Sequence, residues 1–365
     1  MTDMAEGGTG DSGTEALDGV DWVYVLGDVT GVGGTERRMS EAAASLVAAG
    51  GRVTAFVSSV HTASPLTTLL SESGIGVRNT RSILELARFL RRRSTATVFT
   101  FGIRPSLVLR GLRAARVIEN ASFSLRNGLD QGWSTRAHRL DRFTSRWQDG
   151  YLVNSPAVRD HLLAKGARPG SVFVAEGALG AEWLDPSSAR GDGRPVVAMV
   201  GNSRPEKNQL FGLEVFERVA TGENLLKVFT DDASALAARV SPSLAPFVQF
   251  VEGVRLGPDD YDSVDVLLMP STSESVPRVL LEARARGCSV VTSDAGSSAT
   301  VVDERSSRVI SGFEVDVWAE ALAGALDEVD RSRRQLWSGA RTTRQYVVDV
   351  ARLTSLPHDR RRSQT

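Results

Sequence analysis

Short apolar runs alternate with longer amphipathic stretches along most of this sequence. The apolar runs are rich in Val, Leu and Phe, as strands buried on both faces are. In the first half of the chain they are 22–26, 52–57, 96–100, 115–118, 150–153 and 171–174. The stretches with helical spacing between them include 34–49, 81–93, 133–147 and 156–165. This alternation predicts a parallel sheet covered by helices on both faces.

The same alternation resumes after one break at 185–194 (DPSSARGDGR), where Pro, Ser, Gly and mixed charges predict a linker. The later apolar runs are 195–200, 225–229, 264–269 and 289–292. The later helical stretches are 207–220, 277–286 and 313–330. This α/β pattern predicts two doubly wound, Rossmann-like units. The predicted division of the chain is 21–184 for the first unit, 185–194 for the linker, 195–330 for the second unit, and 331–365 for a terminal helix and basic tail.

Length and charge agree with two globular units and add a tail. The 365 residues suit two domains of about 150 residues each. Residues 1–20 hold five acids and no base, a composition that predicts a disordered acidic tail. The formal net charge of the chain is −1. This total predicts no nucleic-acid partner, because proteins of that class carry an excess of Lys and Arg.

Three absences from the sequence predict a cytoplasmic protein. The one cysteine, Cys288, cannot form an internal disulfide, which fits a reducing compartment. No apolar run approaches the roughly 18 residues that a membrane-spanning helix needs. Residues 1–20 also lack the basic start and apolar stretch of a signal peptide.

The near-zero total charge conceals a strongly basic region. Between Arg52 and Arg116 there are eleven arginines and two acids. One interpretation is a solvated domain face. The other is peripheral contact with the inner face of an anionic membrane, where each basic residue contributes about 1 kcal/mol. The arginines expected to make that contact are Arg88, Arg91, Arg92 and Arg93.

The first candidate binding motif is a glycine cluster between the first predicted strand and the first predicted helix. It comprises Gly27, Gly31, Gly33 and Gly34. Glycines let a ligand approach the backbone closely, and the following helix N-terminus favours anions. A nicotinamide site would also need an acid after the second strand, where this chain has 56–59 (FVSS). A nicotinamide-dependent enzyme is therefore disfavoured, and a tight structural turn remains an alternative for the glycines.

The second candidate motif follows the strand predicted at 195–200. The loop after it reads GNSRPEKN and carries Arg204 and Lys207. Both cations would lie at the carboxyl edge of the sheet, where doubly wound folds bind ligands. Arg offers a planar bidentate contact and Lys a mobile point charge, so the pair suits a diphosphate. Surface loops also carry such residues, which leaves a purely solvated loop as the alternative.

The third candidate motif is the segment 270–283, PSTSESVPRVLLEA, which follows the strand predicted at 264–269. Pro277 is expected in the first turn of a helix, where its missing N–H is no loss. Glu274 then precedes the helix and Glu282 lies more than one turn into it. Free amides at the helix start suit phosphate, and carboxylates suit sugar hydroxyls. A capping role for Glu274 and a surface position for Glu282 are the alternatives.

At these motifs the sequence resembles a known family. The pair Glu274-x7-Glu282 within PSTSESVPRVLLEARARGCSVV is similar to the signature of retaining GT-B glycosyltransferases of family 4, also called glycosyl transferases group 1. VGNSRPEKNQ resembles the phosphate-binding loop of that family. GVGGTERRMSEAAASLVAAGGRVTAFV resembles its glycine loop and first helix, and YLVNSPAVRD its last N-terminal strand and helix. The four motifs stand in the family's order and cover roughly residues 22–330.

The resemblance implies a fold, an activity and a set of roles. The fold would be GT-B, with two Rossmann-like domains facing across a cleft. The activity would be hexosyltransferase-type transfer from a UDP or GDP sugar to a glycan, a lipid-linked or a small-molecule acceptor. The donor nucleotide sugar is then a substrate, and no cofactor is expected. The residues implied for the site are Glu274, Arg204 and Lys207 as catalytic groups, and Gly33, Gly34, Glu282, Val279 and Ser275 as donor-binding groups.

The sequence also departs from the family pattern. The family usually has Arg where this chain has Asn202, and Gly where it has Ser275. Its Asn-Gly-Val-Asp before the linker is replaced by 176–179 (EGAL), and its Asp-x-Gly-Gly by 294–297 (DAGS). These replacements keep open a second hypothesis, a catalytically inactive protein of the same fold that binds a nucleotide sugar or supports a partner.

The sequence predicts no metal site. Its four histidines are scattered without zinc-ligand spacing. The one Asp-x-Asp match, Asp260 and Asp262, is interpreted as the start of a helix. The stretch 120–132 is polar and is expected to be a loop that contacts acceptor or merely connects two elements.

Overall fold

The computed structural model describes most of the chain. The described ranges are 17–27, 34–58, 65–79, 82–128, 134–185, 193–253, 256–302, 306–329 and 340–355. Most of the predicted acidic tail, Gly33 and most of the predicted linker therefore lie outside the described residues. Leu17, which the sequence placed in that tail, is completely buried in the first hydrophobic core. Burial of this one apolar side chain ties residues 17–20 to the fold.

The N-terminal unit is built on a seven-stranded parallel sheet in the order β3-β2-β1-β4-β5-β6-β7. Its strands are β1 Asp21–Leu26, β2 Arg52–Val57, β3 Gly76–Asn79, β4 Thr97–Phe101, β5 Ser122–Arg126, β6 Gly150–Val153 and β7 Val172–Val174. Its helices are α1 Gly34–Ala48, α2 Pro65–Glu72, α3 Ile83–Arg92, α4 Ile103–Ala114, α5 Thr135–Thr144 and α6 Pro156–Ala164.

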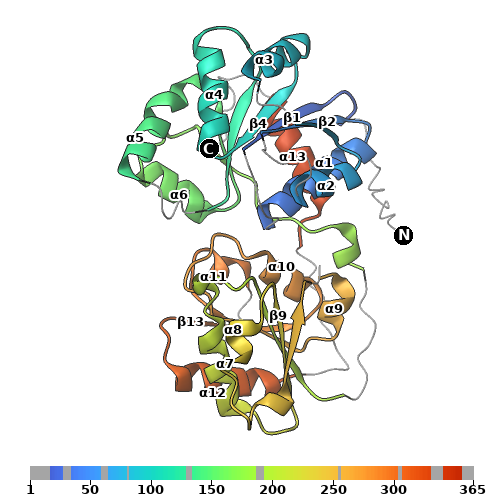
Figure 1. Cartoon of the computed structure of the whole chain (residues 1–365), viewed down its shortest axis with the longest axis vertical. Coiled ribbons are helices and arrows are strands. Elements are labelled where there is room, and N and C mark those ends of the chain that lie inside the picture. Colours follow the sequence, from blue (N-terminus) through green and yellow to red (C-terminus); the bar gives the residue numbers. More distant parts are fainter. Residues whose placement is uncertain are drawn as a thin grey trace, which may run out of the picture.

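Helices cover both faces of this sheet because alternate strand residues point to opposite sides. Trp22 and Tyr24 pack with α1 and α2 in one core, whereas Val23 and Val25 pack with α3 and α4 in another. Figure 1 shows the two groups of helices on either side of the strands. The apolar runs predicted as strands at 22–26, 52–57 and 96–100 are confirmed as β1, β2 and β4.

The C-terminal unit repeats the architecture with a six-stranded parallel sheet, in the order β10-β9-β8-β11-β12-β13. Its strands are β8 Val196–Val200, β9 Leu225–Thr230, β10 Val248–Glu252, β11 Val266–Met269, β12 Ser289–Ser293 and β13 Ser307–Ile310. Its helices are α7 Gln209–Val219, α8 Ser234–Ala237, α9 Pro258–Asp262, α10 Arg278–Ala285, α11 Ser298–Val301 and α12 Val315–Asp327. Figure 1 shows the two units one above the other along the long axis.

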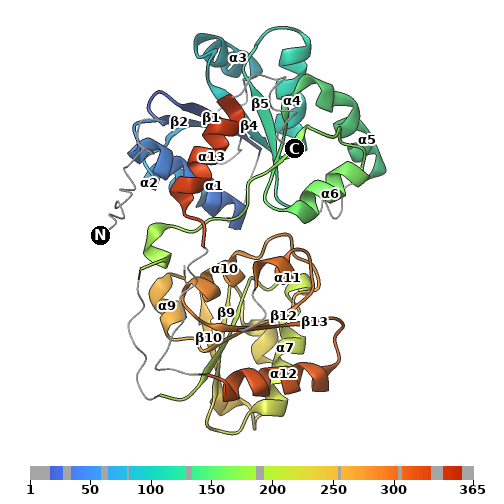
Figure 2. The ribbon, with the colours of Figure 1, turned by 180° about the vertical axis from the view of Figure 1, so that it is seen from behind.

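The chain crosses between the units twice. Leu179 pairs with Thr342 in a parallel bridge, so the two crossing segments lie side by side. After the second crossing, helix α13 (Thr343–Ser355) returns to the N-terminal unit, where Val347 is completely buried in the core shared with α1. Figure 2 shows α13 lying beside α1. The predicted terminal helix therefore belongs to the first sheet, although it follows the second in sequence.

Two sequence predictions in the first unit are wrong. Residues 115–118 form no strand, because the chain turns there and Arg116 adopts a left-handed conformation with φ of 55°. The strand lies instead at β5, within the stretch 120–132 that was predicted to be a loop. One face of β5 carries Ser122, Ser124 and Arg126, which are buried against polar partners rather than apolar ones. This polar face hides the strand from a hydrophobic pattern.

Candidate functional site

The loops after β8 and β11 bring two predicted site residues into contact. Lys207 ends a 3₁₀ turn (Pro205–Lys207), and Glu274 lies in the loop between β11 and α10. Lys207 Nζ donates a hydrogen bond of 2.6 Å to Glu274 Oε1. The two side chains are mostly buried, so this ion pair is less screened by solvent than a surface pair would be. Residues from two separate sequence motifs thus form one charged centre at the carboxyl edge of the sheet.

Two glycines shape the backbone around this centre. A Cβ at Gly201 would lie 3.2 Å from Lys207 Cγ, so the absence of a side chain lets the lysine stem lie over the end of β8. Gly296 has a φ of +62°, and a Cβ there would overlap the carbonyl oxygen of Glu274. Of the two glycines in the Asp-x-Gly-Gly pattern of the family, this chain keeps the first, Gly296, and the Glu274 loop packs against it.

Arg204 does not join the Lys207–Glu274 pair. Its side chain is 68 % exposed, and its ion pair is with Glu206 at 3.9 Å. The nearby Asn202 has a buried Oδ1 with no hydrogen-bond partner among the described residues. Of the two cations predicted to bind phosphate, Lys207 contacts a predicted site carboxylate and Arg204 does not. The role of Arg204 in phosphate binding stays a prediction.

Glu282 lies inside helix α10 and is almost completely buried, 4 % exposed. Its Oε2 accepts a hydrogen bond from the Tyr261 hydroxyl at 2.9 Å, and its Oε1 accepts one from Arg278 Nε at 2.6 Å. Burial, followed by the charge of Glu282, raises the pKa of Tyr261 well above its usual value, so the hydroxyl stays protonated and donates. Each Glu282 oxygen accepts one of these hydrogen bonds, and its remaining lone pair would accept the predicted hydrogen bond from a ribose hydroxyl.

Helix α10 begins one residue later than the sequence predicted. Pro277 is the N-cap, with extended backbone, and Arg278 is the first helical residue. The predicted position in the first turn is therefore wrong by one residue, because Leu280 N bonds back to the Pro277 carbonyl as to an N-cap residue. Val279 is partly buried near the start of the helix, where free amides face the sheet edge.

Arg278 is a site residue that the sequence reasoning missed. Besides Glu282, it contacts Glu41 on α1 of the other unit, with 2.8 Å from Nη1 to Oε2 and 2.8 Å from Nη2 to Oε1. Burial lowers the pKa of Arg278, but the charges of Glu282 and Glu41 outweigh that effect and raise it above its ordinary value. A single arginine thus joins the predicted ribose carboxylate to the N-terminal unit.

Ser275 makes the second contact between the units. Its Oγ donates to the Asn127 carbonyl after β5, and Asn154 Nδ2 after β6 donates to Ser275 Oγ at 3.4 Å. Gly34, at the start of α1, lies close to Arg278: a Cβ added at this glycine would be 4.0 Å from the Cβ of Arg278. The segment 274–278 therefore meets the carboxyl edge of the first sheet, and the stretch 120–132 contributes Asn127 to this interface.

The Glu41–Arg278 pair is expected to be energetically coupled. In a double-mutant cycle of Glu41→Ala and Arg278→Ala, urea unfolding should give a coupling free energy of about 1–3 kcal/mol, since the groups touch and are shielded from solvent. The exposed pair Arg204 and Glu206 provides a control cycle, in which less than about 1 kcal/mol is expected. Equal coupling in the two cycles would contradict the interdomain role of Arg278.

The basic region separates into two parts. Arg88, Arg91 and Arg92 are exposed on α3. Arg93 instead folds back onto Asp21, with 2.7 Å from Nε to Oδ2 and 2.6 Å from Nη2 to Oδ1. The prediction that Arg93 faces a membrane is therefore wrong, because a carboxylate at the start of β1 holds its guanidinium.

Two further sequence expectations concern metals and membranes. Asp260 accepts a hydrogen bond from Gly257 N at the start of α9, and Asp262 pairs with Arg286, so both carboxylates have structural partners. Among the described residues, no group of three or more His, Cys, Asp and Glu side chains is placed to hold a metal ion. No helix in the described ranges is both long and apolar enough to span a membrane.

The chain is similar to known proteins both in sequence and in fold. Residues 194–328 match the family model of glycosyl transferases group 1. The group 1 segment thus contains Arg204, Lys207, Glu274 and Glu282. The described residues have the GT-B fold, with two Rossmann-like units, which confirms the predicted fold. A glycosyltransferase from Rickettsia africae superposes with a TM-score of 0.73 at 15 % identity, covering 92 % of this chain and 93 % of that one.

Other similar proteins extend the comparison. Anabaena Alr3699/HepE, solved in complex with UDP, has a TM-score of 0.72 at 15 % identity and covers 94 % of this chain and 97 % of its own. A D-inositol 3-phosphate glycosyltransferase 2 of Catenulispora acidiphila is 41 % identical over 86 residues, 23 % of this chain and 20 % of that protein. A GDP-mannose-dependent alpha-mannosyltransferase of Mycolicibacterium smegmatis is 26 % identical over 208 residues, 56 % of this chain and 48 % of that protein. The aligned parts thus span at most about half of these curated relatives.

Proposed function

We propose that this protein transfers a sugar from a nucleotide diphosphate sugar to an acceptor hydroxyl, with retention at the anomeric carbon and without a metal ion or cofactor. The observation that carries the proposal is the Lys207–Glu274 ion pair, which lies at the carboxyl edge of the second sheet, within the segment that matches group 1. Next to it, Ser275 contacts the other unit. It places a cation and a carboxylate together at the position where a doubly wound sheet binds ligands. The names of the relatives support the same class of reaction and a UDP or GDP donor.

In this proposal the cationic groups bind the diphosphate and the carboxylates bind sugar hydroxyls. Lys207, Arg204 and the amides at Arg278 and Val279 would neutralise the diphosphate, and electrostatic stabilisation of this kind often lowers the barrier more than any other catalytic effect. Glu274 would hold the hydroxyls of the donor sugar, and Glu282 those of the ribose. Gly33 and Gly34 would line the cleft from the N-terminal side, where the lack of a side chain lets the diphosphate approach the backbone.

The proposed step needs no group from outside the two substrates. The bond between the anomeric carbon and the diphosphate oxygen breaks, and its electron pair leaves with the diphosphate. The acceptor oxygen forms its bond to the same face of the oxocarbenium-like sugar. Its proton passes to the departing phosphate oxygen, which balances the charges. Glu274 positions the sugar and does not attack it.

Assays of the purified protein with UDP-glucose and GDP-mannose test this function. We expect one of these donors to raise the unfolding temperature and to be consumed, in the presence of EDTA, with the anomeric configuration of the donor retained in the product by NMR. A ligand at 100 times its Kd adds about 2.7 kcal/mol of stability. No binding of either nucleotide sugar, or inversion at the anomeric carbon, would contradict the proposal.

A second candidate function is nucleotide-sugar binding without transfer. The observation that favours it is the position of Arg204, exposed and turned to Glu206, together with Asn202 in place of the family arginine. A diphosphate would then meet fewer fixed cations than catalysis needs. Tight binding of a nucleotide sugar, with neither transfer nor donor hydrolysis, would establish this function in place of the first.

We also propose peripheral contact with an anionic membrane through α3. This helix exposes Ile83 and Leu84 as well as its arginines, a combination that suits a lipid surface. Arg88→Gln with Arg91→Gln should weaken binding to phosphatidylserine vesicles by roughly 30-fold, since each arginine contributes about 1 kcal/mol.

The matched control for the membrane contact removes the same charge from the other unit. Arg218→Gln with Arg239→Gln changes two exposed arginines far from α3 and should leave sedimentation with vesicles unchanged. Equal loss of vesicle binding in both double variants would reduce the effect to net charge. No loss in either would leave α3 as a solvated face.

A further inference from the structure

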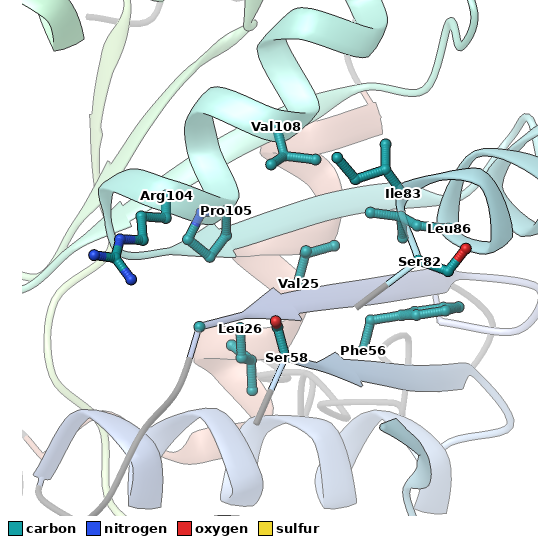
Figure 3. A pocket seen from close by; sticks show the side chains of 11 residues that line it. Val25, Leu26, Phe56, Ser58, Ser82, Ile83, Leu86, Arg104, Pro105 and Val108 are labelled. Carbon is teal, nitrogen blue, oxygen red and sulfur yellow. The ribbon is translucent and has the colours of Figure 1, made fainter. Parts of the chain in front are cut away.

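A cavity of about 380 Å³ opens in the N-terminal unit, away from the charged centre of the other unit. Figure 3 shows it between the ends of β1 and β2 on one side and the first turns of α3 and α4 on the other. Its lining is mostly apolar and includes Val25, Phe56, Leu86, Pro105 and Val108. The volume is that of a pocket for a small molecule or for part of a larger one.

The lining separates into an apolar interior and a polar rim. Val25, Leu86 and Val108 project into the space between the sheet and the helices (Figure 3). The polar side chains of the lining, Ser58, Ser82 and Arg104, are all exposed. Such a site takes up an apolar group in its interior and leaves one cation at its mouth for an anion.

The position of the cavity relates it to the donor site. It opens where β1 and β2 end, on the same sheet edge as Asn127 and Asn154, which contact Ser275. From β1 to β5 is two strand spacings in the sheet order, roughly 10 Å at about 4.8 Å each. A molecule anchored in the cavity therefore reaches the cleft only if its apolar end and its reacting hydroxyl are separated by a spacer of that length.

We propose that this cavity binds the apolar end of a lipid-linked acceptor, whose phosphate lies against Arg104 and whose sugar hydroxyl faces the donor cleft. The inference rests on the proposed function, and it selects one of the acceptor classes. A free sugar phosphate or a soluble glycan would leave the apolar interior unfilled. In a lipid-linked acceptor the hydrocarbon chain would occupy the apolar interior, the phosphate would lie at the polar rim, and the sugar would reach the donor cleft.

Binding of decyl phosphate, below its micellar concentration, tests the site. Calorimetry should give a Kd at least tenfold lower for decyl phosphate than for inorganic phosphate. Val108→Trp fills the cavity and should weaken decyl phosphate at least tenfold. The control Val117→Trp changes an exposed valine outside the lining and should have no effect. Arg104→Gln should weaken decyl phosphate and leave decanol unchanged.

A second variant keeps the test open if the tryptophan disturbs folding. Ile83→Glu puts a negative charge at the exposed mouth of the cavity and should repel the phosphate, whereas Val117→Glu, outside the lining and outside α3, should not. Wild-type affinity in both Val108→Trp and Ile83→Glu would overturn the proposal. So would D-inositol 3-phosphate, which has no alkyl chain, binding as tightly as decyl phosphate and with the same sensitivity to Val108→Trp.

UDP and GDP are titrated into the same samples. Normal nucleotide binding with no specific uptake of decyl phosphate would overturn the cavity's role and leave the proposed function standing. Cavity-dependent binding of decyl phosphate, without binding of any nucleotide or nucleotide sugar, would overturn the proposed function and leave the cavity as a binding site for alkyl phosphates. The two failures are therefore distinguishable.

Discussion

Replacing Lys207 by methionine is expected to lower sugar transfer about 10²–10³-fold, the loss typical when one preorganised charge-stabilising group is removed. The ammonium lies 2.6 Å from Glu274 and would face the diphosphate as it leaves. Methionine keeps the stem that packs over Gly201 and removes the charge alone. Because the charge on the leaving group grows in the transition state, kcat should fall more than the donor KM rises.

The control for this variant is Lys165→Met, which removes an exposed lysine at the end of α6. Its kcat and KM should match those of the original protein. Steady-state rates with the donor identified by binding, together with circular dichroism of both variants, make the comparison. An unchanged kcat in the folded Lys207→Met protein would remove Lys207 from the site.

The largest expected loss of stability comes from Asp141→Ala. Asp141 Oδ1 accepts hydrogen bonds of 2.8 Å from Arg110 and 2.8 Å from Arg126. Its Oδ2 accepts one of 2.9 Å from the hydroxyl of Tyr151, whose pKa burial and the Asp141 charge raise to about 12. Removing the carboxylate leaves two buried guanidinium groups without their shared counter-charge. The expected cost is about 3–5 kcal/mol.

Thermal unfolding followed by circular dichroism measures this loss. For a unit of this size, about 2–4 °C per kcal/mol gives a Tm lowered by roughly 6–20 °C. Asp160→Ala is the control, because Asp160 is exposed and pairs with the exposed Arg159, and surface changes of this kind stay within about 0.5 kcal/mol. Similar Tm values for the two variants would show that the buried cluster contributes little.

That buried cluster also explains why β5 escaped prediction. The strand β1 is apolar on both faces after Asp21 and appears in the hydrophobic pattern. The strand β5 places Ser124 and Arg126 against Arg110 and Asp141, residues that come from α4 and α5. A pattern that equates burial with apolar side chains cannot detect such a strand. The partners that make its burial favourable are supplied by other elements.

The site shows the same division. Each loop was predictable on its own: a cation-bearing turn after one strand and a carboxylate before one helix. The contact between Lys207 and Glu274 depends on β8 and β11 being neighbours in the sheet. Arg278 gave no signal, because an arginine at the start of a helix is ordinarily a surface residue. Its partner Glu41 lies on a helix of the other unit, 237 positions earlier in the chain.

The sequence by itself determined the α/β class, most of the core strands and the order of the loops that carry Lys207, Glu274 and Glu282. These are local properties, set by the spacing of apolar residues and by turn residues between them. The tertiary structure alone decided that Arg204 faces solvent, that Arg93 is held by Asp21, that α13 returns to the first unit, and that an apolar cavity opens at the edge of the first sheet. Each of these depends on which distant segments share a sheet edge, and hydrophobic periodicity carries no information on that point.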